Sequence, residues 1–163
     1  MPAFPPFYTS DPGDLGLDRN VGLLIRQLHT LIHQVINQMA GPLGLTSHQW
    51  RPLLLIRYKG IDTPAELARA LCIDTGAVTR ALDRLVAKGF VRRERASDDR
   101  RVVKIVLTDA GVTASSQILP IIAETLNLHL QGFSDDEFRM LLSLLRRMIA
   151  NGESHLRATA PKQ

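Results

Sequence analysis

The chain has 163 residues, of which 45% are hydrophobic and only 5% aromatic, and its formal net charge is +4. This length fits one domain, or one domain with a helical extension. Leucine, isoleucine, valine and alanine supply most of the apolar surface, so the composition favours packing between helices over a β-sandwich. The single cysteine, Cys72, excludes an intrachain disulfide framework and suits a reducing compartment.

Several function classes are excluded by what the sequence lacks. No run of about 18 apolar residues is present, so no transmembrane helix is expected. The N-terminus has no basic region followed by an apolar run, as a secretory signal would. We therefore predict a cytoplasmic protein without a membrane partner. The sequence shows no nucleophile–base signature, phosphate loop or metal motif, so we expect neither an enzyme nor a bound cofactor or metal.

The positive charge is concentrated in one part of the chain. Ten Lys or Arg and five Asp or Glu lie between Arg69 and Lys104, which gives this window a net charge of +5 and leaves −1 for the rest of the chain. Such a patch is typical of a protein that binds a polyanion. The alternative is an ordinary solvated basic surface.

The first forty residues predict an arm followed by a long helix. Residues 1–17 contain four of the nine prolines and no helical periodicity, which predicts an extended arm. From residue 18 to about Met39, apolar residues recur at three- and four-residue steps, as in an amphipathic helix. Three aromatic residues of the arm suit docking against another surface, such as a partner subunit: Phe4, Phe7 and Tyr8.

Helix-capping signals predict three helices in the centre of the chain. Thr46 with Gln49, and Thr63 with Glu66, have the spacing of a capping box. Asp74 fits a single N-cap. The expected helices span residues 47–58, 64–71 and 75–88.

After Gly89 the hydrophobic period changes from that of a helix to that of a strand. Residues 90–95 and 101–107 alternate like strands, and residues 96–99 have the composition of a hairpin tip. Helix, short turn, helix and hairpin, in this order, form a winged helix-turn-helix. We therefore predict a mainly α fold with a small β-hairpin wing.

Two further helices are expected at residues 109–131 and 135–150, followed by a flexible tail at residues 151–163. The second helix has a capping box of Ser134 and Glu137. The terminal helices have more apolar surface than one winged lobe can cover, which predicts a homodimer; the alternative is an intrachain helical bundle. Two interior prolines are expected either to bend or to split their helices: Pro52 and Pro120.

The helix at residues 75–88 has the chemistry of a DNA-reading element. Arg80 and Arg84 lie four residues apart and share one face. Arginine offers a planar fork of donors that suits guanine edges and phosphates. The inward stripe consists of Val78, Leu82 and Leu85, whereas Thr75, Gly76, Thr79 and Asp83 also fall on the outer side. The alternative is an amphipathic helix with a solvated basic face.

The hairpin is rich in arginine, which can enter a minor groove, where the electrostatic potential is most negative. These arginines are Arg92, Arg93, Arg95, Arg100 and Arg101. Asp99 is placed to hold an arginine side chain through a fork-like pair. The alternative is a polar hairpin with surface ion pairs.

Three segments together resemble the MarR family of bacterial regulators, over about residues 18–150. They are Leu45-Thr46 with Gln49-Trp50-Arg51, Asp74-Thr75-Gly76-Ala77-Val78-Thr79-Arg80, and Asp99-Arg100-Arg101 followed by Ile105-Val106-Leu107-Thr108. The wing pattern, an Asp-x-Arg followed by a hydrophobic-x-Leu-Thr strand, is the most specific of the three.

The resemblance implies a homodimer that binds pseudo-palindromic DNA, with a winged lobe at residues 46–108 and a dimerisation region at residues 18–45 and 109–150. It also implies repression of a neighbouring gene and release by a small, often aromatic and anionic, molecule. It places Arg101, supported by Asp99, in the minor groove. It places Thr75, Gly76, Thr79 and Arg80 at the major groove, and we add Thr63, Arg84, Arg93, Arg95 and Arg100 as candidate DNA contacts.

The effector of such a regulator is predicted here to be an aromatic carboxylate bound in an anion pocket. Our candidates for the pocket are His33, Trp50, Arg51 and Arg57, although Trp50 also fits a core position and Arg57 a surface position. His29 and His33 have a spacing that can bind a metal, but no cluster of further ligands lies nearby in sequence.

Cys72, in the turn between the two motif helices, is interpreted as a small buried hydrophobic residue, with redox sensing as the alternative. Two other functions therefore stay open: a redox- or metal-responsive regulator, and a winged-helix module that binds another protein.

Overall fold

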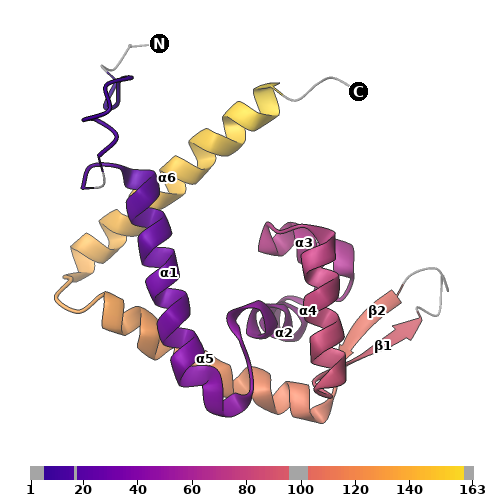
Figure 1. The fold of residues 1–163 in the computed structure, drawn as a ribbon. Helices are drawn as coiled ribbons and strands as arrows, with labels where there is room; N and C mark the ends of the chain where they lie inside the picture. The colour runs from indigo at the N-terminus through magenta and orange to yellow at the C-terminus, as the bar shows by residue number, and fades with distance from the viewer. Residues whose placement is uncertain (1–5, 17, 96–102, 160–163) are drawn as a thin grey trace. The chain divides into compact units, whose positions relative to one another are not determined.

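The computed structural model describes residues 6–16, 18–95 and 103–159 of the chain (Figure 1). Its elements are α1 (Val21–Ala40), η1 (Gly41–Leu43), α2 (Ser47–Lys59), α3 (Pro64–Leu71), α4 (Thr75–Ala87), β1 (Val91–Arg95), β2 (Val103–Leu107), α5 (Asp109–His129) and α6 (Asp135–Thr159). The chain divides into two compact units, residues 1–125 and residues 126–163.

The first unit contains the predicted winged lobe. Helices α2, α3 and α4 lie beside the hairpin in Figure 1. The two strands are antiparallel, and Val91 pairs with Leu107 while Arg95 pairs with Val103. The backbone N–H of Ile105 also donates to the Asp62 carbonyl at 2.7 Å, which joins the hairpin to the loop before α3. The predicted mainly α fold with a hairpin wing is confirmed.

One hydrophobic core connects the lobe to the flanking helices of the first unit. Leu53, Leu67 and Leu82 come from the three helices of the lobe and are fully buried. Ile36 of α1 and Ile118 of α5 are buried in the same core. The last part of α1 and the first part of α5 therefore contribute to the same core as the lobe.

The capping interactions explain where the helices begin. The Thr46 N–H donates to Gln49 Oε1 at 3.1 Å, as a capping box requires. The Ala77 N–H donates to Asp74 Oδ1 at 2.8 Å, and the Ser134 N–H donates to Glu137 Oε2 at 2.8 Å. These predicted caps are confirmed. Helix α1 starts at Val21 rather than at residue 18 because Asn20 is its N-cap.

Neither interior proline splits its helix. Pro52 lies inside α2 and Pro120 inside α5, and both helices are continuous through these positions. An interior proline removes one backbone hydrogen bond. Pro52 is itself buried, so part of this cost is offset by apolar burial.

In the second unit, α6 is longer than predicted. The expected end near residue 150, followed by a flexible tail, was wrong because the helix continues to Thr159. An ion pair within this last stretch, between Arg157 and Glu153 one turn earlier, supports the extension. Among the described helices, none combines the length and apolar content that crossing a membrane requires.

Candidate nucleic-acid interface and adjoining pocket

Helix α4 has one buried side and one exposed side. Val78, Leu82 and Leu85 are 0% exposed and fix the helix against the core of the lobe. Arg80 and Arg84 are exposed on the other side. The burial pattern therefore confirms the predicted inward stripe and presents both guanidinium groups to solvent.

The start of α4 is shaped by a glycine. A Cβ atom at Gly76 would lie 3.0 Å from Asp74 Oδ1 and 3.3 Å from Arg80 Nη1. The absence of a side chain thus leaves room for the Asp74 cap and for the Arg80 guanidinium over the first turn. The Thr79 hydroxyl donates to the Thr75 carbonyl at 2.9 Å, so it is engaged with the helix backbone in this structure.

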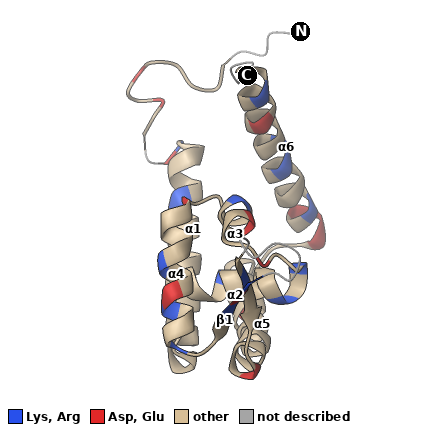
Figure 2. Ribbon diagram, turned by 90° about the vertical axis from the view of Figure 1, so that its right-hand side faces the viewer, with Lys and Arg blue, Asp and Glu red and all other residues tan. Residues whose placement is uncertain are grey.

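Figure 2 colours the positions of Lys and Arg blue, including those on β1. The basic residues of β1 are exposed, and two of them have acidic neighbours. Arg93 Nη2 lies 2.6 Å from Asp83 Oδ1 on α4, and Arg92 Nε lies 2.6 Å from Glu94 Oε1. The Arg93–Asp83 pair joins the wing to the outer side of α4. Three candidate DNA contacts lie outside the described residues: Asp99, Arg100 and Arg101.

Thr63, another candidate DNA contact, caps α3. Its hydroxyl donates to Glu66 Oε2 at 2.6 Å and accepts from the Glu66 N–H at 3.4 Å. Asp62, the residue before Thr63, forms an ion pair with β2, because its Oδ2 lies 3.1 Å from Lys104 Nζ. Thr63 is therefore held at the edge of the lobe, next to the base of the wing.

Lys88, which sequence reasoning missed, joins the end of α4 to the start of α2. Its Nζ donates to the Gly44 carbonyl at 2.5 Å and to Gln49 Oε1 at 3.0 Å. The same Gln49 oxygen accepts from the Thr46 N–H. No local pattern predicts this contact, because Lys88 is 39 residues from Gln49 in the sequence.

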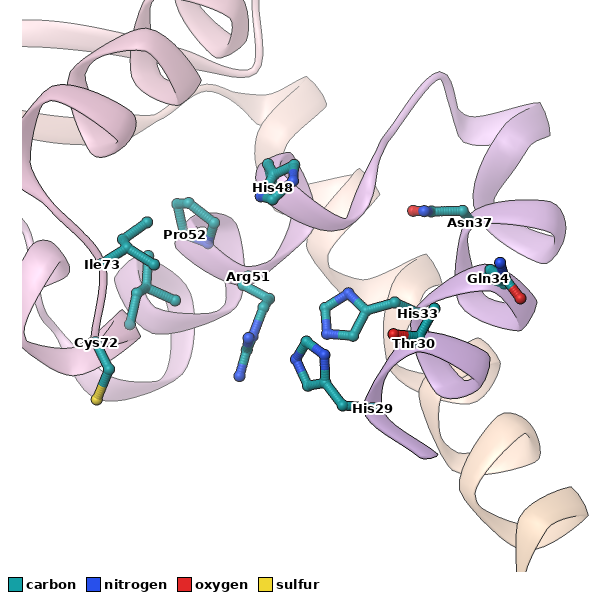
Figure 3. A pocket seen from close by; sticks show the side chains of 11 residues that line it. His29, Thr30, His33, Gln34, Asn37, His48, Arg51, Pro52, Cys72 and Ile73 are labelled. Carbon is teal, nitrogen blue, oxygen red and sulfur yellow. The ribbon is translucent and has the colours of Figure 1, made fainter. Parts of the chain in front are cut away.

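A pocket of about 470 Å³ lies between α1, α2 and the turn after α3 (Figure 3). Two of the four candidate ligand residues line it, His33 and Arg51. Trp50 belongs to the hydrophobic core and Arg57 is exposed elsewhere on α2. The remaining lining residues are His29, Thr30, Gln34, Asn37, His48, Pro52, Leu71, Cys72 and Ile73.

The pocket brings imidazoles and a guanidinium together. The ring centroids of His29 and His33 are 4.2 Å apart, and those of His33 and Trp50 are 6.2 Å apart. Burial, and then the nearby charges of His29, Arg51 and His48, lower the pKa of His33 below its ordinary value. Within the described part of the chain, no group of three or more metal-ligating side chains is assembled.

The indole ring of Trp50 lies in the core next to His33 and Arg51. Trp50 is 7% exposed, and the Arg51 guanidinium carbon lies 5.9 Å from its ring centroid. Its buried Nε1 has no hydrogen-bond partner among the described residues. The ring therefore supports the stacked His33 and Arg51 without lining the pocket itself.

The expectation that Cys72 is buried was wrong. The residue is exposed and has a φ of 53°, because it is the left-handed C-cap of α3. Its Sγ lies 3.7 Å from the Arg69 carbonyl, and the residue is among those that line the pocket.

Comparison with known proteins decides the family. The family model described as the MarR family matches residues 45–103. The multiple antibiotic resistance protein MarR of Escherichia coli strain K12 is 34% identical over 130 residues, which cover 79% of this chain and 90% of that protein. The chain belongs to the MarR family. It is therefore a transcription regulator, as the resemblance implied, and not a member of an enzyme family.

One further relative and one solved structure agree with this assignment to the MarR family. The transcriptional repressor NicR of Pseudomonas putida is 29% identical, with 82% of this chain and 85% of NicR covered. A crystal structure of a mutant MarR from Escherichia coli complexed with operator DNA has a TM-score of 0.73 and 32% identity, and the match covers 82% of this chain and 96% of that one. The matched family region includes all of α2, α3 and α4.

Proposed function

We propose that the protein is a homodimeric repressor that binds a pseudo-palindromic operator and leaves it when a small aromatic anion binds. The main observation is the outer side of α4, where Arg80 and Arg84 project from a helix whose other side is fully buried. The relationship to NicR, a repressor, and to a MarR solved with operator DNA supports this proposal.

In this proposal α4 enters the major groove. Thr75, Gly76, Thr79 and Arg80 approach base edges, while Arg84 and Thr63 contact the backbone. Guanine presents two acceptors that fit the arginine fork of Arg80. A symmetric dimer presents two such helices, so half-sites are expected about one helical turn apart.

The wing lies beside the minor groove in the same proposal. Arg95 on β1, with Asp99, Arg100 and Arg101, makes the wing contacts. Arg93 is 2.6 Å from Asp83 in the structure without DNA. Because both side chains are half-exposed, this pair is weak and Arg93 is able to turn to a phosphate when DNA is present.

The second copy of the chain covers exposed apolar helix surface. Leu24, Ile25 and Leu28 of α1 are each more than 40% exposed. Helix α6 has no buried residue over its 25 positions, although Met148 and Ile149 are large and apolar. A helix with an apolar stripe needs a partner surface. The dimer predicts a mass twice 18.1 kDa by light scattering.

Release of the operator is assigned to the pocket between α1 and α2. Arg51 and three histidines surround a space of about 470 Å³, within the size range of sites for small molecules. The Arg51 guanidinium, the imidazoles, and the apolar walls of Pro52, Leu71 and Ile73 suit an aromatic carboxylate. We place this regulator in the cytoplasm, together with the DNA that it binds.

The experiment that tests the proposal is a fluorescence-anisotropy titration. DNA from upstream of the protein's own gene is compared with a scrambled duplex at equal salt, with and without benzoate. Arg80→Ala is expected to weaken specific binding by roughly 5- to 150-fold, the equivalent of about 1–3 kcal/mol for a base contact. Arg157→Ala, which removes an exposed arginine of α6, is the matched control and should leave affinity unchanged.

Two results would contradict the proposal. Equal and weak binding to both duplexes would favour a winged-helix module that binds another protein. If the protein binds the operator specifically but no aromatic carboxylate releases it, the proposed DNA contacts stand. The proposed class of effector is then wrong.

A further inference from the structure

We propose that the pocket between α1 and α2 binds its anion together with a proton, which is held by His33 beside His29 and His48. This inference rests on the anion pocket proposed above. It adds that ligand-induced release of the operator responds to pH, because the protein takes up a proton as the ligand binds.

The lining of the pocket contains one permanent positive charge. That charge is Arg51, since no lysine and no other arginine is among the described residues that line the space. No aspartate or glutamate is among these lining residues either. A bound carboxylate therefore meets Arg51 and the imidazoles, and no acidic group in the described lining competes for them. Figure 3 shows the side chains of His29, His33 and Arg51 turned toward the same space.

The side chains that surround His33 in the pocket include two other imidazoles and a guanidinium. His29 and His33 stand one turn apart on α1, and their ring centroids are 4.2 Å apart. His48 and Arg51 of α2, and Cys72 in the turn after α3, also line the pocket. Two like charges this close in a partly buried site repel each other strongly. Burial, and after it the charges of these neighbours, lowers the pKa of His33 below its ordinary value.

A bound anion is expected to shift the pKa of His33 in the opposite direction. A carboxylate between Arg51 and His33 favours the imidazolium form, because an opposite charge within hydrogen-bonding distance raises the pKa of a histidine. The proton comes from solvent and stays on His33 as long as the anion is bound. Affinity then increases as the pH falls, by up to about tenfold per pH unit for each proton taken up.

The pH window follows from the direction of the shift. The pKa of His33 in the structure lies below its ordinary value of 6.5. A bound carboxylate is expected to raise this pKa. Proton uptake is confined to the interval between these two values. Below the interval both states hold the proton, and above it neither does, so the affinity levels off on each side.

The fluorescence of Trp50 can be used to follow the protonation of His33. Trp50 is the only tryptophan, and its ring is 6.2 Å from that of His33. A protonated imidazole quenches the fluorescence of an adjacent indole more strongly than a neutral one. The emission of Trp50 at each pH therefore follows the protonation of His33 directly.

The test uses the full-length protein and benzoate, which stays ionised across the range from about pH 5.5 to about pH 8. Calorimetric titrations in two buffers with different ionisation enthalpies give the number of protons taken up. We expect benzoate to bind at least about fivefold more tightly at pH 6 than at pH 8. The midpoint of the Trp50 quenching curve should move to higher pH when benzoate is present.

Two variants test whether His33 is the group that takes up the proton when benzoate binds. His33→Gln should reduce the proton uptake and flatten the pH dependence of benzoate affinity, while operator binding is retained. His155→Gln, on α6 and not among the lining residues, should behave like the unchanged protein. An unchanged pH dependence in His33→Gln would overturn the inference.

Two further outcomes overturn it in different ways. Benzoate affinity that is equal at pH 6 and pH 8, with no shift of the quenching curve, would refute the proton uptake. The proposal of an anion pocket would be unaffected. No benzoate binding at any pH, with operator binding intact, would refute both the proton uptake and the proposed effector site.

Discussion

Gly111, at the third position of α5, packs directly against the base of the wing. A Cβ atom built on this residue would lie 1.9 Å from the Phe90 carbonyl oxygen and 3.2 Å from Leu107 Cδ2. The first contact is roughly 1.4 Å shorter than the ~3.3 Å of a close carbon–oxygen approach. The Phe90 oxygen cannot move freely, because it accepts from the Thr108 N–H at 3.1 Å. Gly111→Ala therefore forces a backbone shift.

The cost of this substitution follows from two opposing effects. Overpacking a tight site costs about 1–3 kcal/mol, and a backbone contact belongs at the upper end of that range. The higher helix propensity of alanine offsets up to about 1 kcal/mol of this overpacking cost. We expect a net loss of about 2 kcal/mol in the free energy of unfolding. For a chain of this size, the loss lowers the Tm by about 4–8 °C.

The assay is urea denaturation at a fixed protomer concentration, followed by circular dichroism. Gly152→Ala is the matched control, because Gly152 lies inside α6 and a Cβ atom there meets nothing within 4 Å. That variant should gain up to about 1 kcal/mol from helix propensity alone. If Gly111→Ala unfolds at the same urea concentration as the unchanged protein, α5 does not pack on the wing as described.

Three other changes have defined outcomes. Asp74→Ala removes the N-cap of α4 and should cost about 0.5–2 kcal/mol of stability in urea, whereas Asp74→Asn should restore most of it. Arg93→Ala breaks a half-exposed ion pair, so thermal denaturation should show a loss below about 1 kcal/mol, while anisotropy should show weaker operator binding. The unfolded chain protonates His33 near the ordinary histidine pKa of 6.5, and the folded chain does so only at lower pH. Stability should therefore fall as pH drops below 6.5 and level off below the folded pKa, and His33→Gln should reduce that slope.

Local signals in the sequence identified the helix starts and the wing. The caps at Thr46, Asp74 and Ser134 were predictable because a hydroxyl or carboxylate and the amide that it caps are three residues apart. The change of hydrophobic period after Gly89 likewise located the hairpin, whose strands are Val91–Arg95 and Val103–Leu107. Such features depend only on the order of neighbouring residues.

The end of α6 shows the limit of these local signals. The sequence analysis predicted a flexible tail from residue 151 onward. The helix continues to Thr159 all the same. Cys72 shows a similar limit, because a turn between two packed helices was expected to bury it, whereas the left-handed cap turns it outward.

The sequence alone determined the family, the winged lobe and the basic outer side of α4, because these depend on residues within one or two helical turns of each other. Only the tertiary structure decided which distant side chains meet. It brought Arg51 to His33, Arg93 to Asp83 and Lys88 to Gln49, and it placed Trp50 in the core behind the pocket. The physical reason is that such contacts depend on how the helices pack across the core, and no spacing along the chain records that packing.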